Sequence, residues 1–279
     1  MRIISWNVNG IRATSGKIKN GDKTGSSSDN VIKTLINEQK PDILCFQEVK
    51  TQNPSDLDIF KSDYKYILNN FSKSKKGYSG VSLMTNKKPL WVSHDFSLYS
   101  EDEIGNYSDY EFIHEGRVLT ARFDNMVVVV VYVPNSQPKL ARIELRVEWE
   151  RILRNYLKTL KEKMSVQVIM VGDLNVAPKE IDIHDPKGKT KVPGFSPQER
   201  CEFKKMLDCG MVDSFRHKYP DAVKYTYYSN FANSREKGNG WRIDMAMISD
   251  SIKSKIIEAD CLEEYHGSDH VPILLDIDI

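Results

Sequence analysis

The chain has 279 residues, of which 40% are hydrophobic and 28% are charged, a composition that excludes a disordered tail protein, a collagen and a coiled coil. The 40 Lys and Arg residues nearly balance 39 Asp and Glu residues, which argues against a sequence-independent DNA coat but not against a nucleic-acid enzyme with a local basic face. No apolar run is long enough for a membrane helix, the N-terminus has no signal-peptide pattern, and the four cysteines are scattered, so we expect a reduced, intracellular protein.

Apolar segments with β-branched residues predict strands along the whole chain. The segment 127–133 is almost entirely β-branched, which is typical of a strand buried on both faces. In chain order, strands are predicted at 3–7, 42–46, 80–84, 127–133, 166–171, 243–248 and 272–277.

Helices are predicted between these strands. Asp29 is expected to cap a helix over 30–39, and apolar residues at helical spacing predict a second helix over 140–164. Ser196 begins a capping box with Pro at the first helical position, which predicts a third helix from Pro197 to about Leu207. Strands and helices alternate without a linker, so we expect one α/β domain over 1–279.

Two polar stretches are predicted to be surface loops. Residues 15–28 are rich in Gly, Ser, Lys and Asn and read as a flexible insertion, and residues 100–115 are polar and acidic.

Polar residues that suit metal or phosphate chemistry occur where the strands end or begin. Each is weak evidence alone, because a single Asp or Asn is usually a turn or cap residue. Their repeated position beside apolar strands predicts one common site, since strand ends are where layered α/β proteins build sites. The residues are Asn7, Glu48, Tyr132, Asn135, Asp173, Asn175, Asp244, Asp269 and His270.

The chemistry of these residues can be stated. Glu48, Asp269 and the Asn7 amide offer oxygen donors, which suit Mg²⁺ or Mn²⁺ and not zinc. Asp173 is a candidate general base for a water, and Asn175 faces the same side of an extended segment.

His270 is a candidate donor to a phosphoryl oxygen, with Asp244 holding the imidazole in the correct tautomer. Tyr132 and Asn135 add neutral donors. One divalent cation, one carboxylate base and several donors describe hydrolysis of a phosphodiester.

The chain resembles the apurinic/apyrimidinic (AP) endonucleases of the exonuclease III family, within the endonuclease/exonuclease/phosphatase superfamily. The resemblance reaches from residue 3 to residue 275 and is carried by ISWNVNGIRA, PDILCFQEVK, GYSGVSLMT, EGRV, YVPN, VIMVGDLNVAP, EIDIHDPKG, GFSPQER, VDSFRHKYP, GWRIDMAMIS and GSDHVPI. It implies a four-layer α/β sandwich, in which two mixed β-sheets pack face to face with helices outside.

The resemblance also implies an activity and its partners. The enzyme would hydrolyse the phosphodiester 5′ to an abasic site in duplex DNA during base excision repair, with added 3′-phosphodiesterase and 3′→5′ exonuclease activity. The partner would be duplex DNA with abasic sites or blocked 3′ ends. Mg²⁺, for which Mn²⁺ can substitute, would be the only cofactor, and we expect a monomer.

Residue roles follow from the same resemblance. The implied metal residues are Asn7, Glu48, Asp173, Asn175 and Asp269. The implied catalytic residues are Tyr132, Asn135, Asp173, Asn175, Asp244 and His270. The implied substrate-binding residues, which include the wall of a pocket for a flipped abasic sugar, are Tyr78, Tyr227, Phe231, Arg235, Trp241 and Ile243.

Some positions depart from the family pattern. Asn9 stands where some relatives have Asp, Pro138 where some have an Arg that contacts DNA, and Phe231 where some have Met. Arg235, Lys237 and Arg242 flank the pocket segment, and we interpret them as DNA phosphate contacts rather than as a solvated face.

Other functions stay open at this stage. Deoxyribonuclease I, neutral sphingomyelinases and inositol polyphosphate 5-phosphatases share several motifs, although the first of these has a second catalytic His where this chain has YVPN. A catalytically inactive DNA-binding protein, an exonuclease for undamaged ends and an endonuclease for deaminated nucleosides are further alternatives.

Overall fold

The computed structural model describes residues 1–17, 30–108, 110–231 and 233–279. Its framework is a pair of six-stranded sheets and a small two-stranded sheet. The first large sheet has the order β13 (Ile256–Cys261), β14 (Ile273–Ile277), β1 (Arg2–Asn7), β2 (Ile43–Gln47), β4 (Val81–Thr85), β3 (Tyr66–Asn70). The second has the order β5 (Trp91–Ser93), β6 (Val118–Arg122), β7 (Met126–Tyr132), β8 (Gln167–Asp173), β12 (Asp244–Ser249), β9 (Met211–Asp213). The small sheet pairs β10 (Tyr227–Tyr228) with β11 (Gly240–Trp241).

Both large sheets are mixed. β1 runs parallel to β2, and β7 runs parallel to β8, whereas the other neighbours pair antiparallel. The α-helices are α1 (Ile11–Ser15), α2 (Val31–Gln39), α3 (Glu101–Ile104), α4 (Ile143–Met164), α5 (Pro197–Asp208) and α6 (Ser214–Lys218). The 3₁₀ helices are η2 (Pro54–Phe60), η3 (Glu111–Glu115), η4 (Pro138–Leu140), η5 (Glu180–Asp182) and η6 (Asp250–Lys255).

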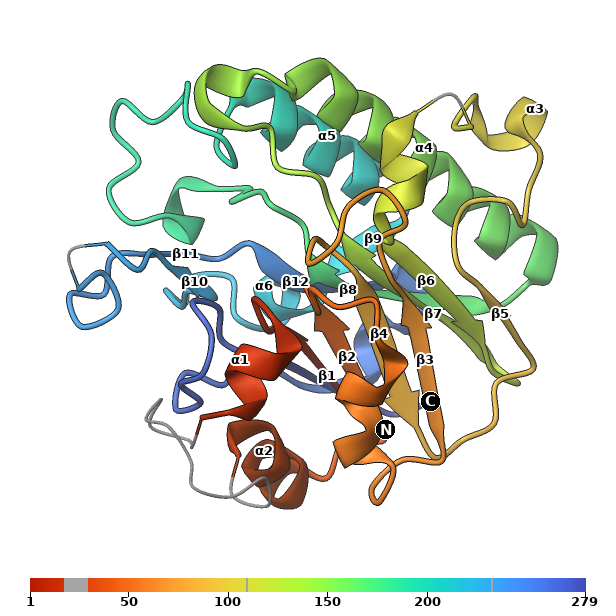
Figure 1. Ribbon diagram of the computed structural model, residues 1–279. Coiled ribbons are helices and arrows are strands. Elements are labelled where there is room, and N and C mark those ends of the chain that lie inside the picture. Colours follow the sequence, from red (N-terminus) through yellow and green to blue (C-terminus); the bar gives the residue numbers. More distant parts are fainter. Residues whose placement is uncertain (18–29, 109, 232) are drawn as a thin grey trace.

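The layers are helix, sheet, sheet, helix (Figure 1). One core lies between the sheets and takes alternate residues from each, such as Cys45 from β2 and Val128 from β7. A second core packs α4 and α5 on the outer face of one sheet, and a third packs α2 on the outer face of the other. The predicted four-layer sandwich is therefore confirmed, because each sheet has apolar residues on both faces and needs a partner on each.

Two local predictions are wrong. Asn30 and not Asp29 caps α2, with its side chain accepting a hydrogen bond from the Lys33 N–H. Residues 100–115 are not simply a surface loop, since they form α3 and η3 and place Ile104 and Phe112 in the core beside α4. Most residues of this segment are polar or acidic, so the sequence pattern alone did not reveal its few buried residues. Residue 29 and all but the first three residues of the predicted 15–28 insertion lie outside the described residues.

Strand register brings the predicted site residues to one end of the sandwich. Parallel pairing sets Tyr132 of β7 beside Asp173 of β8, and antiparallel pairing sets Asp244, the first residue of β12, opposite Asp173. In the other sheet, parallel pairing sets Asn7 of β1 beside Gln47 of β2, so Glu48 follows at the same edge. Within the described chain, no helix is both long and apolar enough to span a bilayer.

Candidate active site

A cavity of about 840 Å³ opens at this end of the sandwich. It brings together residues from separate strands and loops that the sequence predicted as one site. Those that line it are Glu48, Tyr132, Asn135, Asp173, Asn175, Tyr227, Trp241, Ile243, Asp269 and His270.

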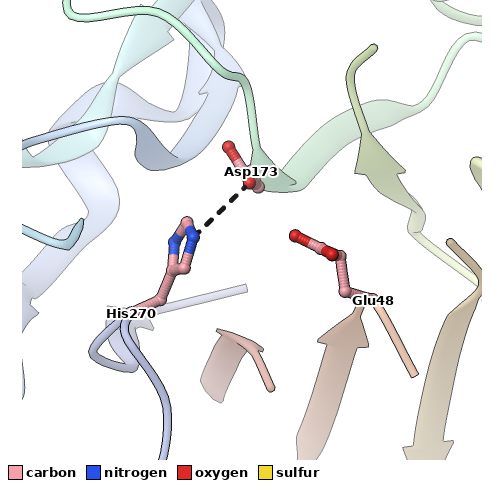
Figure 2. Close-up of side chains that lie close together, drawn as sticks. All are labelled: Glu48, Asp173 and His270. Atoms are coloured by element: carbon pink, nitrogen blue, oxygen red, sulfur yellow. Dashed lines mark ion pairs between the residues drawn. The ribbon is translucent and has the colours of Figure 1, made fainter. Parts of the chain in front are cut away.

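Glu48, Asp173 and His270 form the centre of the cavity (Figure 2). Each offers one ligand atom, and these atoms lie within 4.8 Å of one another. His270 Nε2 is 3.9 Å from Asp173 Oδ2, and His270 Nδ1 is 2.8 Å from Asp244 Oδ2. The Asp244–His270 pairing therefore has the predicted geometry, with Nε2 directed towards the cavity centre.

The backbone before Asp173 has little room. Gly172 has φ 147°, and a Cβ there would lie 1.9 Å from the Val131 carbonyl oxygen, so glycine is required at this close approach of β7 and β8. Beyond the strand, Asn175 adopts φ 48° and its N–H donates to Asp173 Oδ1 at 2.8 Å. This turn fixes the carboxylate orientation.

Asn175 and Asn135 are linked to each other. Asn175 Nδ2 donates to the Val133 carbonyl at 2.8 Å, and Asn135 Nδ2 donates to Asn175 Oδ1 at 3.1 Å. The second Asn135 amide hydrogen can still donate to a bound oxyanion.

Asn7 lies between the two carboxylates. Its Nδ2 donates to Glu48 Oε1 and to Asp173 Oδ2, each at 2.9 Å, while its Oδ1 accepts the Asn9 N–H at 3.0 Å. In this arrangement the Asn7 amide nitrogen bridges the two carboxylates, and its amide oxygen is engaged by the Asn9 N–H.

Lys50 is a site residue that the sequence analysis missed. Its Nζ is 2.8 Å from Glu48 Oε2 and also donates to the Asn9 side chain. Asn9 Nδ2 in turn donates to Asp269 Oδ1 at 2.9 Å. The sequence did contain a signal for Lys50, because this residue lies two positions after Glu48, just beyond a buried strand.

The pKa of each titratable group at the centre of the cavity depends on the charges of its neighbours. Burial and the charge of Asp244 raise the pKa of Asp173 above its ordinary value. Burial alone would lower the pKa of His270, but the charge and hydrogen bond of Asp244 outweigh it and raise that pKa to about 10. Burial would raise the pKa of Glu48, yet Lys50 and Asn7 hold it below its ordinary value.

Tyr132 rests on a buried cation. The Arg117 guanidinium lies 4.6 Å from the Tyr132 ring centroid, donates to the Tyr132 carbonyl at 3.1 Å, and donates to the Tyr78 hydroxyl at 2.7 Å. Burial and the nearby Glu48 carboxylate raise the pKa of Tyr132 well above its ordinary value, so its hydroxyl stays protonated and can donate.

The donor set fits a hard divalent cation. Glu48 and Asp173 present carboxylate oxygens close to each other, and the cavity wall adds the Asp269 carboxylate. His270 Nδ1 is already engaged by Asp244, and the set contains no Cys, so the site differs from a zinc centre.

An apolar recess adjoins this centre. The Trp241 side chain of β11 and Ile243 form its wall with Tyr227, whose ring centroid is 4.9 Å from that of His270. Gly194 backs the indole so closely that a Cβ would lie 3.3 Å from Trp241 Cζ3.

The family model of the endonuclease/exonuclease/phosphatase family matches residues 4–270. The chain belongs to this family. The exodeoxyribonuclease of Bacillus subtilis is 39% identical over 280 residues that span 100% of both proteins. The DNA repair nuclease APEX1 of Danio rerio is 36% identical over 280 residues, 99% of this chain and 81% of that protein. The crystal structure of an AP endonuclease from Leishmania major has a TM-score of 0.83 at 27% identity and covers 100% of this chain and 87% of that one.

These comparisons confirm the predicted resemblance, since both named relatives align with the chain from end to end. In this chain the site lies at the carboxyl end of the parallel pairs β1–β2 and β7–β8.

Some predicted substrate residues lie outside the cavity. Phe231 is 84% exposed on the loop after β10, and Tyr78 is bound to Arg117. Arg235 directs its guanidinium to the carbonyls of Glu263 and Tyr265 and lies over the Tyr228 ring.

The interpretation of Arg242 as a DNA contact is wrong. Its side chain is 1% exposed and pairs with Asp182 and Asp213, each at 2.7 Å. It lies between Trp241 and Ile243 in sequence, and its alternation in an extended segment points it away from the cavity that they line.

Proposed function

We propose that this protein is a Mg²⁺-dependent DNA repair nuclease that cleaves the phosphodiester 5′ to an abasic site. The supporting observation is the juxtaposition of two features in one cavity. A carboxylate–imidazole centre suited to phosphodiester hydrolysis adjoins an apolar recess walled by Trp241 and Ile243.

The centre supports an in-line hydrolysis. Asp173 accepts the proton of the attacking water, and its orientation is held by the Asn175 N–H and by Asn7. His270 Nε2, held by Asp244 on the opposite ring nitrogen, donates to a phosphoryl oxygen. Tyr132 and Asn135 offer further donors to the charge that develops in the transition state.

Glu48, Asp173 and Asp269 are the residues that would hold the cation, with Asn7 supporting the first two. When bound, a divalent cation supplies positive charge that neutralises the phosphate and favours the ionised form of Asp173. Because Lys50 occupies one side of Glu48, binding of a cation there requires the ammonium to share or release that oxygen.

The recess supplies selectivity. The catalytic centre recognises a phosphodiester, which every nucleotide carries, so preference for a lesion must come from the surroundings of the sugar. An indole and a branched aliphatic give apolar contact to a bare deoxyribose and leave little room for a base, and an abasic nucleotide is the least costly to extrude.

The test is incubation with matched duplexes that carry a tetrahydrofuran abasic analogue, no lesion, or a uridine, in Mg²⁺ and in EDTA. We expect incision on the 5′ side of the tetrahydrofuran in Mg²⁺ or Mn²⁺ only. Incision of the uridine strand alone would instead favour an endonuclease for deaminated nucleosides. If none of the three duplexes is incised with Mg²⁺ or with Mn²⁺, the proposal is overturned.

Processing of 3′ ends is a second candidate activity. The Bacillus subtilis relative is named an exodeoxyribonuclease, and a 3′ end offers the Asp173 centre the same kind of phosphodiester as an internal lesion does. A duplex with a recessed 3′ end, and one with a 3′-phosphate, separate the two activities, because both rely on the same Asp173 and differ in the DNA that reaches it. In the cell, we propose a monomer that acts at DNA.

A further inference from the structure

A second cavity of about 590 Å³ opens beside the active-site cavity. Its lining includes Lys139, Leu140, Lys191 and Gln198, and the two lysines also line the active-site cavity. Both lysine side chains are exposed, and neither forms an ion pair with any residue that the structure describes. Two uncompensated ammonium groups therefore stand at the border between the two cavities.

One buried carboxylate holds the two loops that carry these lysines. Glu199 of α5 accepts from the Ser136 hydroxyl at 2.5 Å with Oε1, and from the Gly194 N–H at 2.9 Å with Oε2. Glu199 is 0% exposed, so these bonds do not compete with water. Ser136 lies three residues before Lys139 and Gly194 three residues after Lys191, so the carboxylate fixes both loops relative to each other.

The backbone around Lys139 is strained. Gln137, Lys139 and Leu140 have φ values of 62°, 60° and 60°, in the left-handed region that non-glycine residues rarely adopt. Such strain persists only where the surroundings hold it and is concentrated at functional sites.

We propose that Lys139 and Lys191 bind backbone phosphate of the strand whose phosphodiester reaches Asp173, and that the second cavity holds the neighbouring nucleotide of that strand. This inference rests on the proposed function. In a DNA strand, phosphates follow one another every ~3.4 Å along the helix axis, so a strand leaving the active-site cavity carries negative charge directly to its border.

The test measures binding of a fluorescent tetrahydrofuran duplex in EDTA over a range of KCl concentrations. Each phosphate contact contributes a slope of about 0.9 to the plot of log Kd against log salt. We expect Lys139→Ala and Lys191→Ala each to reduce the slope by about one and the double variant Lys139→Ala/Lys191→Ala to reduce it by about two, whereas Lys139→Arg/Lys191→Arg should restore it. Kd at one fixed salt should rise for intact and damaged duplexes alike, since a phosphate contact carries no sequence information.

The matched control is Lys88→Ala/Lys255→Ala, which removes the same charge. Lys88 follows β4, and Lys255 precedes β13, at the end of the sandwich opposite the active site. The double control should keep the slope within about 0.3 of wild type, whereas an equal loss in both double variants would show only a net-charge effect and would overturn the proposal.

A phosphate scan locates the contact. Neutral methylphosphonates are placed one at a time beside the lesion in the same strand. We expect at least one position to weaken wild-type binding several-fold but to leave Lys139→Ala/Lys191→Ala unaffected. If wild type incises the lesion and the lysine variant responds like wild type at every position, the lysine contact is wrong while the proposed function stands; if wild type does not incise it, the proposed function itself fails.

Discussion

Asp173 is the last residue of β8, where hydrogen-bond donors surround its carboxylate and only 2% of its surface is exposed. Its two oxygens are already positioned by Asn7 and the Asn175 N–H, so no reorganisation is needed when a water approaches. Preorganised groups of this kind are where an enzyme gains most of its transition-state stabilisation.

Asp173→Asn tests the base. The amide keeps the size of the side chain but cannot accept a proton, so we expect single-turnover incision of tetrahydrofuran DNA to fall by about 10²–10⁴-fold, with Kd for DNA changed little. The matched control Asp124→Asn alters an exposed carboxylate far from the cavity and should leave the rate unchanged. A near-normal rate in Asp173→Asn would assign the base to another group.

The Asp244–His270 pair gives a pH prediction. Because the pKa of His270 is raised to about 10, the imidazolium should persist at neutral pH in the protein in EDTA. The pair therefore stabilises the fold fully below the ordinary histidine pKa, and this contribution is lost as pH rises through about 10. Histidine ring NMR should show this titration, and Asp244→Asn should move it towards ~6.5. Titration of His270 near 6.5 in the wild type would contradict the assignment.

Short extended segments, and not long helices, build the wall of the recess. β11 ends at Trp241 and β12 begins at Asp244, and the register of β10 with β11 sets Tyr227 beside Trp241. Tyr227 and Trp241 come from these two paired strands, and Ile243 follows from the extended segment between β11 and β12, so alternation along the chain sets Trp241 and Ile243 towards one space.

Trp241→Ala and Ile243→Ala test this wall. Removing either side chain enlarges the recess, so we expect the ratio of incision at tetrahydrofuran to incision of the intact duplex to fall, leaving unstacking energy of a few kcal/mol as the remaining discrimination. Ile257→Ala, at a 56% exposed apolar side chain on β13, is the control. An unchanged ratio in folded Trp241 and Ile243 variants would make these residues part of the core only.

A buried ion-pair network anchors the same segment from behind. Arg242 donates to both Asp182 and Asp213, and Arg216 also donates to Asp182 at 2.5 Å. Burial would raise the pKa of Asp182, but Arg242 and Arg216 hold it below its ordinary value. The network therefore anchors the segment that joins β11 to β12, which carries Arg242 between Trp241 and Ile243.

Arg242→Ala should lower the free energy of unfolding by about 3–5 kcal/mol, because it leaves two buried carboxylates partly uncompensated. Arg151→Ala, which breaks a more exposed pair with Glu148, should cost at most about 1 kcal/mol. Urea unfolding measures both. Equal small losses would show that the buried network contributes little.

At the scale of the whole molecule, the site joins the two sheets. Glu48 comes from the first sheet and Asp173 from the second, and Asn7 bridges them through its amide. A cation held by both carboxylates would therefore cross-link the two halves of the sandwich.

Metal binding should stabilise the fold accordingly. We expect Mg²⁺ or Mn²⁺ to raise the thermal unfolding midpoint relative to EDTA, since a ligand that binds only the folded state stabilises it by an amount that grows with the logarithm of its concentration above Kd. Glu48→Gln should abolish the shift together with incision, whereas Glu162→Gln, at an exposed helix position, should not. Full incision activity in EDTA would refute the metal requirement.

The sequence predicted the elements where local pattern dominates. The β-branched run became β7, the capping box at Ser196 begins α5 as expected, and the apolar stripe over 140–164 became α4 from Ile143. The stretch 100–115 was misjudged because three buried core residues, Ile104, Tyr107 and Phe112, decide its packing, and they are few among polar neighbours.

What the sequence determined by itself was the inventory of the site: polar residues at the ends of apolar strands, in an order that resembles a known nuclease family. Only the tertiary structure decided which partner each side chain in and around the site contacts. Arg242 turned inwards to a pair of buried carboxylates, Lys50 reached Glu48, and Glu199 tied together the loops of Lys139 and Lys191. The physical reason is that local propensity acts over a few residues, whereas the partner of a charge is set by burial and by strand register between segments far apart in the chain.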